Sequence, residues 1–318
     1  MARVKKKDVC IFIPALNEAS SIGKVIDGFH DEGYHNILVV DGKSADNTVD
    51  VATSHGARVV IQRGKGKGQA IRQAFAEEIS TDYVVMIDAD LTYLPSEVET
   101  VLAPVLSDEA DHVIGNRFAN YQAGAFTRLN LFGNKILNRM FGMAHGVWLN
   151  DILSGYRAFN RYTIEKMDLW ENGFEIESEM TVESIKKGIR VKEVPITYRT
   201  RVKGAKTKLK PVRHGWRIGI TIIRLARKSN PLLFVGFIGL LFICAGIVTG
   251  VYVLMDWLVN IEHIPLTILT ALIIIAGIQM VVFGFMGAMI IQSHREVLRE
   301  MRNLDVNIRN YYNKPKIK

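Results

Sequence analysis

Short apolar runs alternate with helix-like stretches along the first two thirds of the chain. The apolar runs are Cys10–Ile13, Asn36–Val40, Ala57–Ile61 and Tyr83–Ile87. Helix-like stretches begin near Ser20, Thr48 and Gln69. Short buried strands that alternate with helices indicate an α/β domain with a mostly parallel, doubly wound sheet. Ligands of such sheets bind beyond the carboxyl ends of the strands, so we expect a binding site at that edge.

The pattern changes after Asn230, where two long apolar segments replace the short runs. These segments, at about 231–255 and 265–292, carry no charged residue. Each exceeds the roughly 20 residues that a helix needs to cross a bilayer. We therefore predict a transmembrane hairpin over residues 230–293. Gly246 and Gly250 form a GxxxG pattern, which favours close helix packing, either within the hairpin or between chains of a homo-oligomer.

Basic residues gather on both outer flanks of this hairpin, and the net charge of the chain is +8. This clustering favours a membrane surface or an anionic substrate over nucleic acid as the partner. Residues 211–229 are amphipathic and predict a helix in the membrane interface, and residues 294–318 form a basic tail. The loop 256–264 lacks Lys and Arg. The positive-inside rule therefore predicts that the first 210 residues and both termini are cytoplasmic and that the loop is outside. We expect the membrane to be the plasma membrane.

Two carboxylates one residue apart follow the fourth apolar run. Asp88 and Asp90, separated by Ala89, can offer oxygen ligands to Mg²⁺ or Mn²⁺, which bind few carboxylates together with substrate phosphates. A metal there would neutralise a diphosphate leaving group. Such triplets are also common in turns and helix caps. The position after a buried strand favours a site for a metal and a nucleotide.

Polar residues also follow the first two apolar runs. Glu18 lies after the first run and Asp41 ends the second. An acidic residue at the end of a strand can accept hydrogen bonds from a nucleobase or from ribose hydroxyls. We prefer this interpretation for both residues, whereas helix capping is the preferred interpretation for Ser44, Asp46 and Thr48.

A glycine-rich turn, Arg63–Gly68, opens the third helix-like stretch. Backbone N–H groups at the start of a helix, with Lys65 or Lys67, could bind an anion there. A purely structural turn explains the glycines equally well. Gly42–Ser44 looks like the end of a P-loop, but Ile37 stands where the required glycine would be, which excludes that motif.

Taken in order, these segments resemble a known family. PALNEA, VVDGKSADNT, GKGKGQAIR and DAD are followed by Gly115–Phe118, Ile152–Ala158 and Gly173–Glu179. The set resembles the family 2, GT-A-type glycosyltransferases, and is most similar to archaeal dolichyl-phosphate hexosyltransferases of protein N-glycosylation. The resemblance implies a GT-A catalytic domain over residues 1–210. It also implies transfer of a hexose from a nucleotide-diphosphate sugar to dolichyl or polyprenyl phosphate, with inversion, for N-glycosylation or cell-envelope glycans.

The resemblance also implies nucleotide-binding residues. These are Pro14, Leu16, Glu18, Asp41, Asp88 and Asp90, of which Asp88 and Asp90 match the catalytic, metal-binding pair. Lys67 of the glycine-rich turn and Ala89, between the two aspartates, complete the predicted nucleotide-binding set. Two positions differ from the dolichyl-phosphate mannose synthases, which carry an aromatic residue at Leu16 and a glutamine at Thr92. These differences favour a UDP-sugar as the donor, with GDP-mannose as the second choice.

Four basic residues match the acceptor side of the family. Arg117 and Arg128 match catalytic arginines that meet the lipid phosphate, and Arg201 and Lys208 match a later basic pair. The guanidinium fork of arginine suits phosphate because it can bind two oxygens at once. A solvated surface charge is the alternative interpretation for each of the four.

A phosphate monoester is already ionised at cytoplasmic pH, so this reaction needs no strong general base. The enzyme would act by positioning and electrostatics. One alternative is a polysaccharide-type glycosyltransferase that acts on a sugar hydroxyl, but the chain lacks the Q-x-x-R-W motif and the further spans typical of that class. A second is a non-catalytic membrane subunit that binds a nucleotide sugar or lipid, against which the intact pair Asp88 and Asp90 argues.

Overall fold

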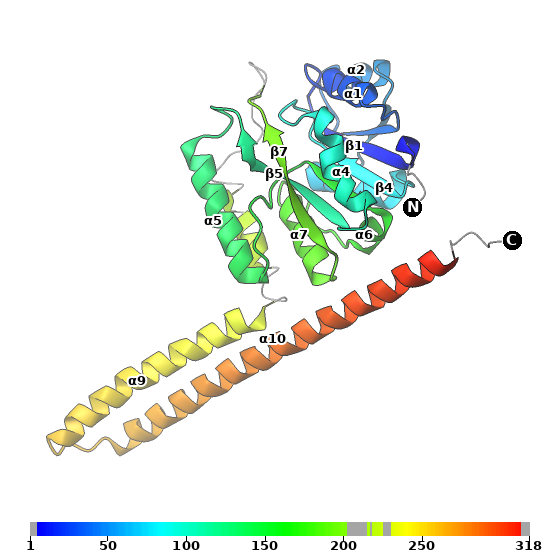
Figure 1. Cartoon of the computed structure of the whole chain (residues 1–318). Helices are drawn as coiled ribbons and strands as arrows, with labels where there is room; N and C mark the ends of the chain where they lie inside the picture. The colour runs from blue at the N-terminus through cyan, green and yellow to red at the C-terminus, as the bar shows by residue number, and fades with distance from the viewer. Residues whose placement is uncertain (1–4, 202–214, 217, 225–229, 313–318) are drawn as a thin grey trace. The chain divides into compact units, whose positions relative to one another are not determined.

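The computed structural model describes residues 5–201, 215–216, 218–224 and 230–312 (Figure 1). The chain divides into two compact units, Met1–Ile222 and Ile223–Lys318. Lys208 and about half of the predicted interfacial helix lie outside the described residues.

A seven-stranded sheet forms the centre of the first unit, in the order β3-β2-β1-β4-β6-β5-β7. Strand β6 runs antiparallel to both of its neighbours, and the other neighbouring strands pair in parallel. The predicted mostly parallel sheet is therefore present. The strands are β1 (Val9–Ala15), β2 (Ile37–Asp41), β3 (Arg58–Ile61), β4 (Tyr83–Met86), β5 (His112–Tyr121), β6 (Arg157–Asn160) and β7 (Val191–Tyr198).

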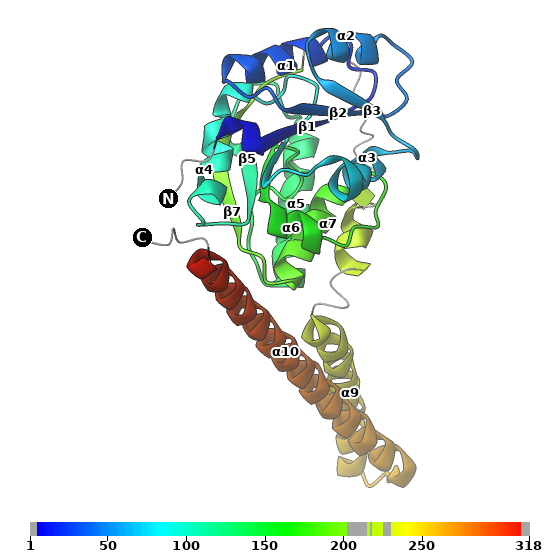
Figure 2. The same cartoon turned by 90° about the vertical axis from the view of Figure 1, so that its right-hand side faces the viewer.

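Helices cover both faces of this sheet (Figure 2). Ile11 and Ile13 of β1 point into one core and Cys10 and Phe12 into the other, because successive side chains of a strand face opposite sides. Burial on both faces explains why the strand is apolar throughout. One face packs against α1 (Ile22–Asp31), α2 (Thr48–Ser54) and α4 (Val98–Leu106), and the other against α3 (Lys67–Gln73), its π-helical continuation Ala74–Glu78, α6 (Arg161–Lys166) and α7 (Ile176–Lys186). Short 3₁₀ turns occupy Lys6–Asp8 and Pro95–Glu97.

A longer helix, α5 (Arg128–His145), exposes an apolar side. The Thr127 hydroxyl caps its start by accepting a hydrogen bond from the backbone N–H of Asn130. The exposed apolar residues follow a helical spacing and are Leu129, Phe132, Ile136 and Met143. The described part of the helix at 215–224 has the same character, since Trp216 and Ile220 are exposed whereas Ile218 and Ile222 are buried.

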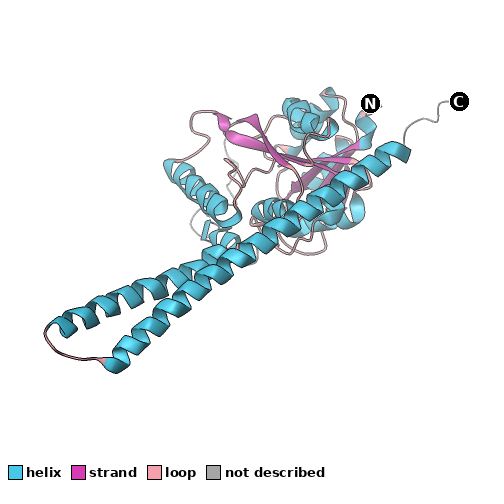
Figure 3. Ribbon diagram, turned by 60° about the horizontal axis from the view of Figure 1, so that its bottom comes forward, coloured by secondary structure: helices cyan, strands magenta, loops and turns pink. Residues whose placement is uncertain are grey.

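The second unit contains a helical hairpin, in which a π-helical turn, Leu232–Gly236, leads into α9 (Phe237–Leu258) and α10 (Ile264–Tyr312) follows (Figure 3). Two segments, Leu232–Leu258 and Ile264–His294, are long and apolar enough to cross a membrane. Glycines let the two helices approach closely: a Cβ on Gly239 would lie 2.6 Å from the carbonyl oxygen of Gly277. Gly246 likewise packs against Ile274, so this glycine face is used within the hairpin. A homo-oligomer through these helices stays a prediction.

Candidate functional site

Asp90 lies buried in the turn after β4 and is held from two sides. The backbone N–H and the hydroxyl of Thr92 both donate to Asp90 Oδ1, at 3.1 and 2.5 Å. The guanidinium of Arg201 lies 2.6 Å from Asp90 Oδ2. Burial alone would lower the pKa of Arg201, but the Asp90 carboxylate raises it by more. Arg201, predicted to bind lipid phosphate, thus contacts the predicted metal ligand directly.

Asp88 belongs to a second charged cluster, centred on Lys67. The ammonium of Lys67 lies 2.5 Å from Asp88 Oδ1 and 2.6 Å from Glu177 Oε1. Burial alone would lower the pKa of Lys67, but the two carboxylates raise it above its ordinary range. The predicted nucleotide residue Lys67 is therefore a fixed cation beside Asp88. The sequence does not single out Glu177, because Glu175, Glu177 and Glu179 occupy alternate positions in one short segment.

The glycine-rich turn before α3 is explained by close packing. The backbone N–H of Gly68 donates to the carbonyl of Asn172 at 3.0 Å. A Cβ on Gly66 would collide with the same carbonyl, and one on Gly68 with the carbonyl of Glu171. Gly66 also has a φ of +96°. These contacts favour the structural interpretation of the turn, which brings Lys67 and α7 together.

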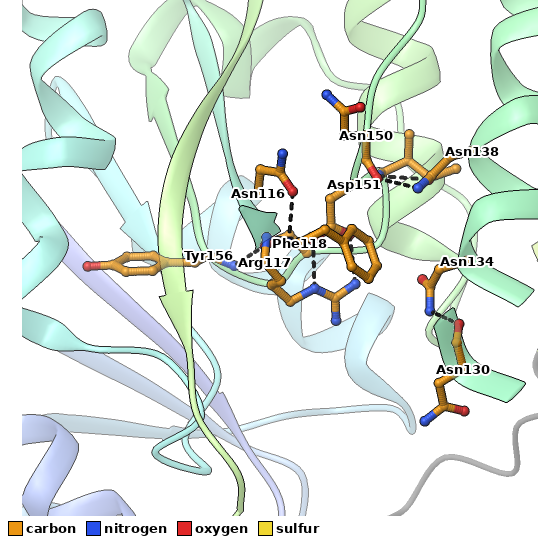
Figure 4. A network of polar contacts seen from close by, with 12 residues as sticks. Asn116, Arg117, Phe118, Asn130, Asn134, Asn138, Asn150, Asp151 and Tyr156 are labelled. Atoms are coloured by element: carbon orange, nitrogen blue, oxygen red, sulfur yellow. Dashed lines mark hydrogen bonds and ion pairs between the residues drawn. The ribbon is translucent and has the colours of Figure 1, made fainter. Parts of the chain in front are cut away.

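Arg117 forms a bidentate ion pair with Asp151 (Figure 4). Its Nε and one terminal nitrogen each donate to Asp151 at 2.7 Å, and its backbone N–H donates at 3.0 Å. Burial alone would lower the pKa of Arg117, but Asp151 raises it. Both oxygens of the fully buried Asp151 accept hydrogen bonds from Arg117. Asp151 therefore serves to orient the guanidinium.

Two tyrosines connect Arg117 to the aspartate pair. The guanidinium carbon of Arg117 lies over the ring of Tyr198, 5.4 Å from the centre of that ring. The Tyr198 hydroxyl is hydrogen-bonded to Thr92. The Tyr93 ring packs against that of Tyr198, and the Tyr93 hydroxyl accepts from the backbone N–H of Gly155 at 2.8 Å. A Cβ on Gly155 would lie 2.5 Å from the Asp88 carboxylate. Arg117, Asp88 and Asp90 thus belong to one site.

The loops after β1 and β2 carry the predicted nucleoside contacts and are tied together. Leu16 is exposed and Glu18 is partly buried, with the Glu18 backbone N–H donating to the Thr48 hydroxyl at 2.8 Å. Asp41 is buried and accepts from the Ser44 backbone and hydroxyl at 2.8 and 2.5 Å. Pro14, two residues before Leu16, lies in β1 opposite Val40. The nucleoside roles of these residues stay predictions.

Arg128 stands apart from this cluster. It is the first residue of α5 and is exposed. Among the described residues, no hydrogen bond or ion pair joins it to Arg117 or to either aspartate. Its role toward a lipid phosphate therefore stays a prediction.

Comparison with known proteins defines the class of the chain. Residues 10–168 match the glycosyl transferase family 2, and the chain belongs to that family. It is 43% identical over 298 residues to the glycosyltransferase AglJ of Haloferax volcanii, covering 93% of this chain and 98% of the relative. It is 32% identical to a dolichyl-phosphate hexose transferase of the same organism, over 70% of this chain and 96% of the relative. The predicted membership is confirmed.

Solved structures support the same fold. Glucosyl-3-phosphoglycerate synthase from Mycobacterium tuberculosis, in complex with Mn²⁺ and UDP-glucose, is similar with a TM-score of 0.57. The similarity covers 69% of this chain and 78% of that one, at 22% identity. At this identity the likeness concerns the fold, and it confirms the predicted GT-A architecture.

Gly155→Ala is expected to lower glycosyl transfer about 10- to 100-fold while leaving the protein folded. The added methyl would push the Asp88 carboxylate aside, and misplacement by about 1 Å can cost 100-fold in rate. The flexible end of a side chain yields easily, so the loss of stability should be small. Turnover and melting temperature test this, with Gly133→Ala as control because a Cβ there meets no atom within 4 Å. Unchanged turnover would contradict the role of Gly155.

Proposed function

We propose that this chain transfers a hexose from a nucleotide-diphosphate sugar to dolichyl or polyprenyl phosphate, with inversion at C1. The observation that carries the proposal is the site that joins the acidic pair Asp88 and Asp90 to the fixed cations Lys67, Arg117 and Arg201. Donor and acceptor both bring phosphate to this reaction, and cations held in place suit both groups. The relatives described as acting on dolichyl phosphate support this acceptor.

The residues of the site fit a divalent cation. No group of three or more His, Cys, Asp or Glu side chains in the described part of the chain is arranged to hold a metal. Asp88 and Asp90 would supply the protein ligands. That set suits Mg²⁺ or Mn²⁺, which complete their coordination with phosphate oxygens and water. A bound metal would supply electrostatic stabilisation to the diphosphate leaving group.

The remaining chemistry belongs to the side chains. Lys67 and Arg201 hold positive charge beside the carboxylates, where negative charge grows on the leaving diphosphate. Arg117, oriented by Asp151, holds the acceptor phosphate for attack at C1. A single displacement inverts the configuration at that carbon. Because the attacking phosphate is already ionised, no residue needs to remove a proton.

The exposed apolar residues support attachment to a membrane. Leu129, Phe132 and Ile136 of α5, with Trp216 and Ile220, offer apolar side chains to a lipid surface. The two long apolar helices would span the plasma membrane. The basic flanks then favour a cytoplasmic catalytic domain with cytoplasmic termini. The site would thus meet the phosphate of a lipid carrier at the cytoplasmic leaflet.

A UDP-sugar is the favoured donor, with GDP-mannose second. A relative from Methanococcus voltae, 27% identical over 60% of this chain, is named UDP-N-acetylglucosamine–dolichyl-phosphate N-acetylglucosaminyltransferase. Leu16 is exposed directly after β1, where the dolichyl-phosphate mannose synthases carry a larger aromatic residue. This difference is consistent with uracil, which differs in size from guanine, as the base of the donor.

The decisive experiment supplies membranes that contain the chain with dolichyl phosphate, Mn²⁺ and a panel of radiolabelled nucleotide sugars. We expect one donor to give a labelled product that extracts into organic solvent. The absence of product from every donor would refute the function. Titration calorimetry of the same nucleotide sugars, with and without Mn²⁺, separates an enzyme from a non-catalytic subunit, which should show no metal-dependent binding.

A further inference from the structure

Glu177 lies at the start of α7, and its carboxyl group is almost fully buried at the predicted donor site. It shares the Lys67 ammonium with Asp88, so the two carboxylates lie on either side of one cation. Its second oxygen, Oε2, is inaccessible to solvent and has no hydrogen-bond partner among the described residues. A buried carboxylate oxygen without a donor is costly, since such groups are normally hydrogen-bonded. An unsatisfied acceptor thus belongs to a residue that shares its cation with the predicted metal ligand.

The chemistry of the bound donor limits what can satisfy this oxygen. An ionised carboxylate oxygen is satisfied by a hydrogen-bond donor or by a cation. The cation that Glu177 contacts, Lys67, lies against Oε1, and the proposed metal belongs to Asp88 and Asp90, which leaves a hydrogen-bond donor for Oε2. The diphosphate and the acceptor phosphate carry negative charge and no such donor at neutral pH. The base and ribose are predicted at the loops after β1 and β2, around Glu18 and Asp41. The remaining group of the donor near Asp88 is the hexose, whose hydroxyls are hydrogen-bond donors.

Resting on the proposed function, we infer that Glu177 Oε2 accepts a hydrogen bond from one hydroxyl of the donor hexose and that Glu177 determines which sugar the enzyme uses. Lys67 holds Oε1 at 2.6 Å, which fixes the direction of the carboxylate. A sugar that lacks this hydroxyl, or points it elsewhere, would leave the buried oxygen unpaired. Pockets built to bind a hydroxyl reject such analogues strongly for this reason.

The test compares the preferred donor with its 2-, 3-, 4- and 6-deoxy analogues in wild type and in Glu177→Ala. In wild type, we expect one analogue to lose about 100-fold or more in kcat/KM. In Glu177→Ala, the kcat/KM of the preferred donor should fall toward that of this analogue. The ratio of the two kcat/KM values should shrink to about threefold or less. Glu177→Gln keeps an acceptor oxygen and should restore part of the ratio.

The matched control is Glu183→Gln, a buried carboxylate of the same helix that pairs with Lys186 and Lys187. This variant should keep the wild-type ratio between the donors. UDP without a sugar should bind Glu177→Ala at least as tightly as it binds wild type, by calorimetry with Mn²⁺. Melting temperatures of all variants report folding.

Two outcomes would overturn the inference. If Glu177→Ala lowers kcat/KM for every donor by the same factor, Glu177 acts only by holding Lys67 in place. If every hexose analogue keeps its activity and a donor with 2′-deoxyribose, run beside them, loses it in a Glu177-dependent way, the oxygen faces the nucleoside. In both cases wild type still glycosylates the lipid. Absence of lipid product in wild type would instead refute the proposed function.

Discussion

Asp90→Asn is expected to lower glycosyl transfer by roughly 1,000-fold or more while the protein stays folded. An amide in place of the carboxylate removes a charged metal ligand and leaves the diphosphate leaving group without part of its electrostatic support. Asp88→Asn should act in the same way. The fold should survive, because the Arg201 partner of Asp90 keeps partial access to water. Turnover at saturating Mn²⁺ and the melting temperature measure the two effects.

The matched control is Asp82→Asn, an exposed aspartate immediately before the opposite end of the same strand, β4. It should keep wild-type turnover. A purified Asp88→Asn or Asp90→Asn variant with wild-type turnover would overturn the metal assignment. A tenfold rise in the Mn²⁺ concentration that gives half-maximal activity, with turnover kept, would mean that the substituted residue aids metal binding without being needed for transfer.

Asp151→Asn is expected to reduce the free energy of unfolding by about 3–5 kcal/mol and to abolish transfer. The substitution leaves the nearly buried guanidinium of Arg117 without a compensating charge. It also removes the bidentate contact that orients Arg117 toward the acceptor. Denaturant unfolding of the purified first unit or full chain measures the stability, and the lipid-product assay measures activity.

A second variant separates charge from function at this pair. Replacing both partners, Arg117→Met with Asp151→Leu, should recover much of the lost stability, because an apolar pair avoids an unpaired buried charge. The same variant should remain inactive. Glu109→Gln, which breaks an exposed pair with Lys192, is the control and should cost less than about 1 kcal/mol. Recovered activity in the double variant would show that Arg117 is not needed for the acceptor.

The elements that surround the site follow from local patterns in the sequence. The strands β1, β2 and β4 are short and apolar, and the chemistry-bearing residues Asp41 and Asp88 come at or just after their carboxyl ends. A parallel sheet brings those ends to one edge, so the location of the site is predictable from the alternation alone. The direction of β6 is not predictable from the sequence, because the residue types of a strand as short as Arg157–Asn160 do not specify whether it pairs in parallel or antiparallel.

The partners of the charged residues could not be predicted in the same way. Lys67 and Glu177 lie far apart in the sequence and meet only because the turn before α3 packs against the segment that leads to α7. The contact of Arg201 with Asp90 likewise joins residues far apart in the sequence, and its role toward the lipid phosphate stays a prediction. Such pairs depend on tertiary packing, which side-chain type and spacing do not encode. The sequence singles out Lys67, Asp90 and Arg201, and the fold shows which residues each of them contacts.

Helix α10 is longer than a bilayer requires. It runs unbroken for 49 residues, whereas its apolar segment ends at His294. With a rise of about 1.5 Å per residue, the remaining turns to Tyr312 would project roughly 27 Å past the hydrocarbon, as a rigid rod rather than a loose tail. A rod of this length would carry the backbone at its far end well beyond the lipid head groups.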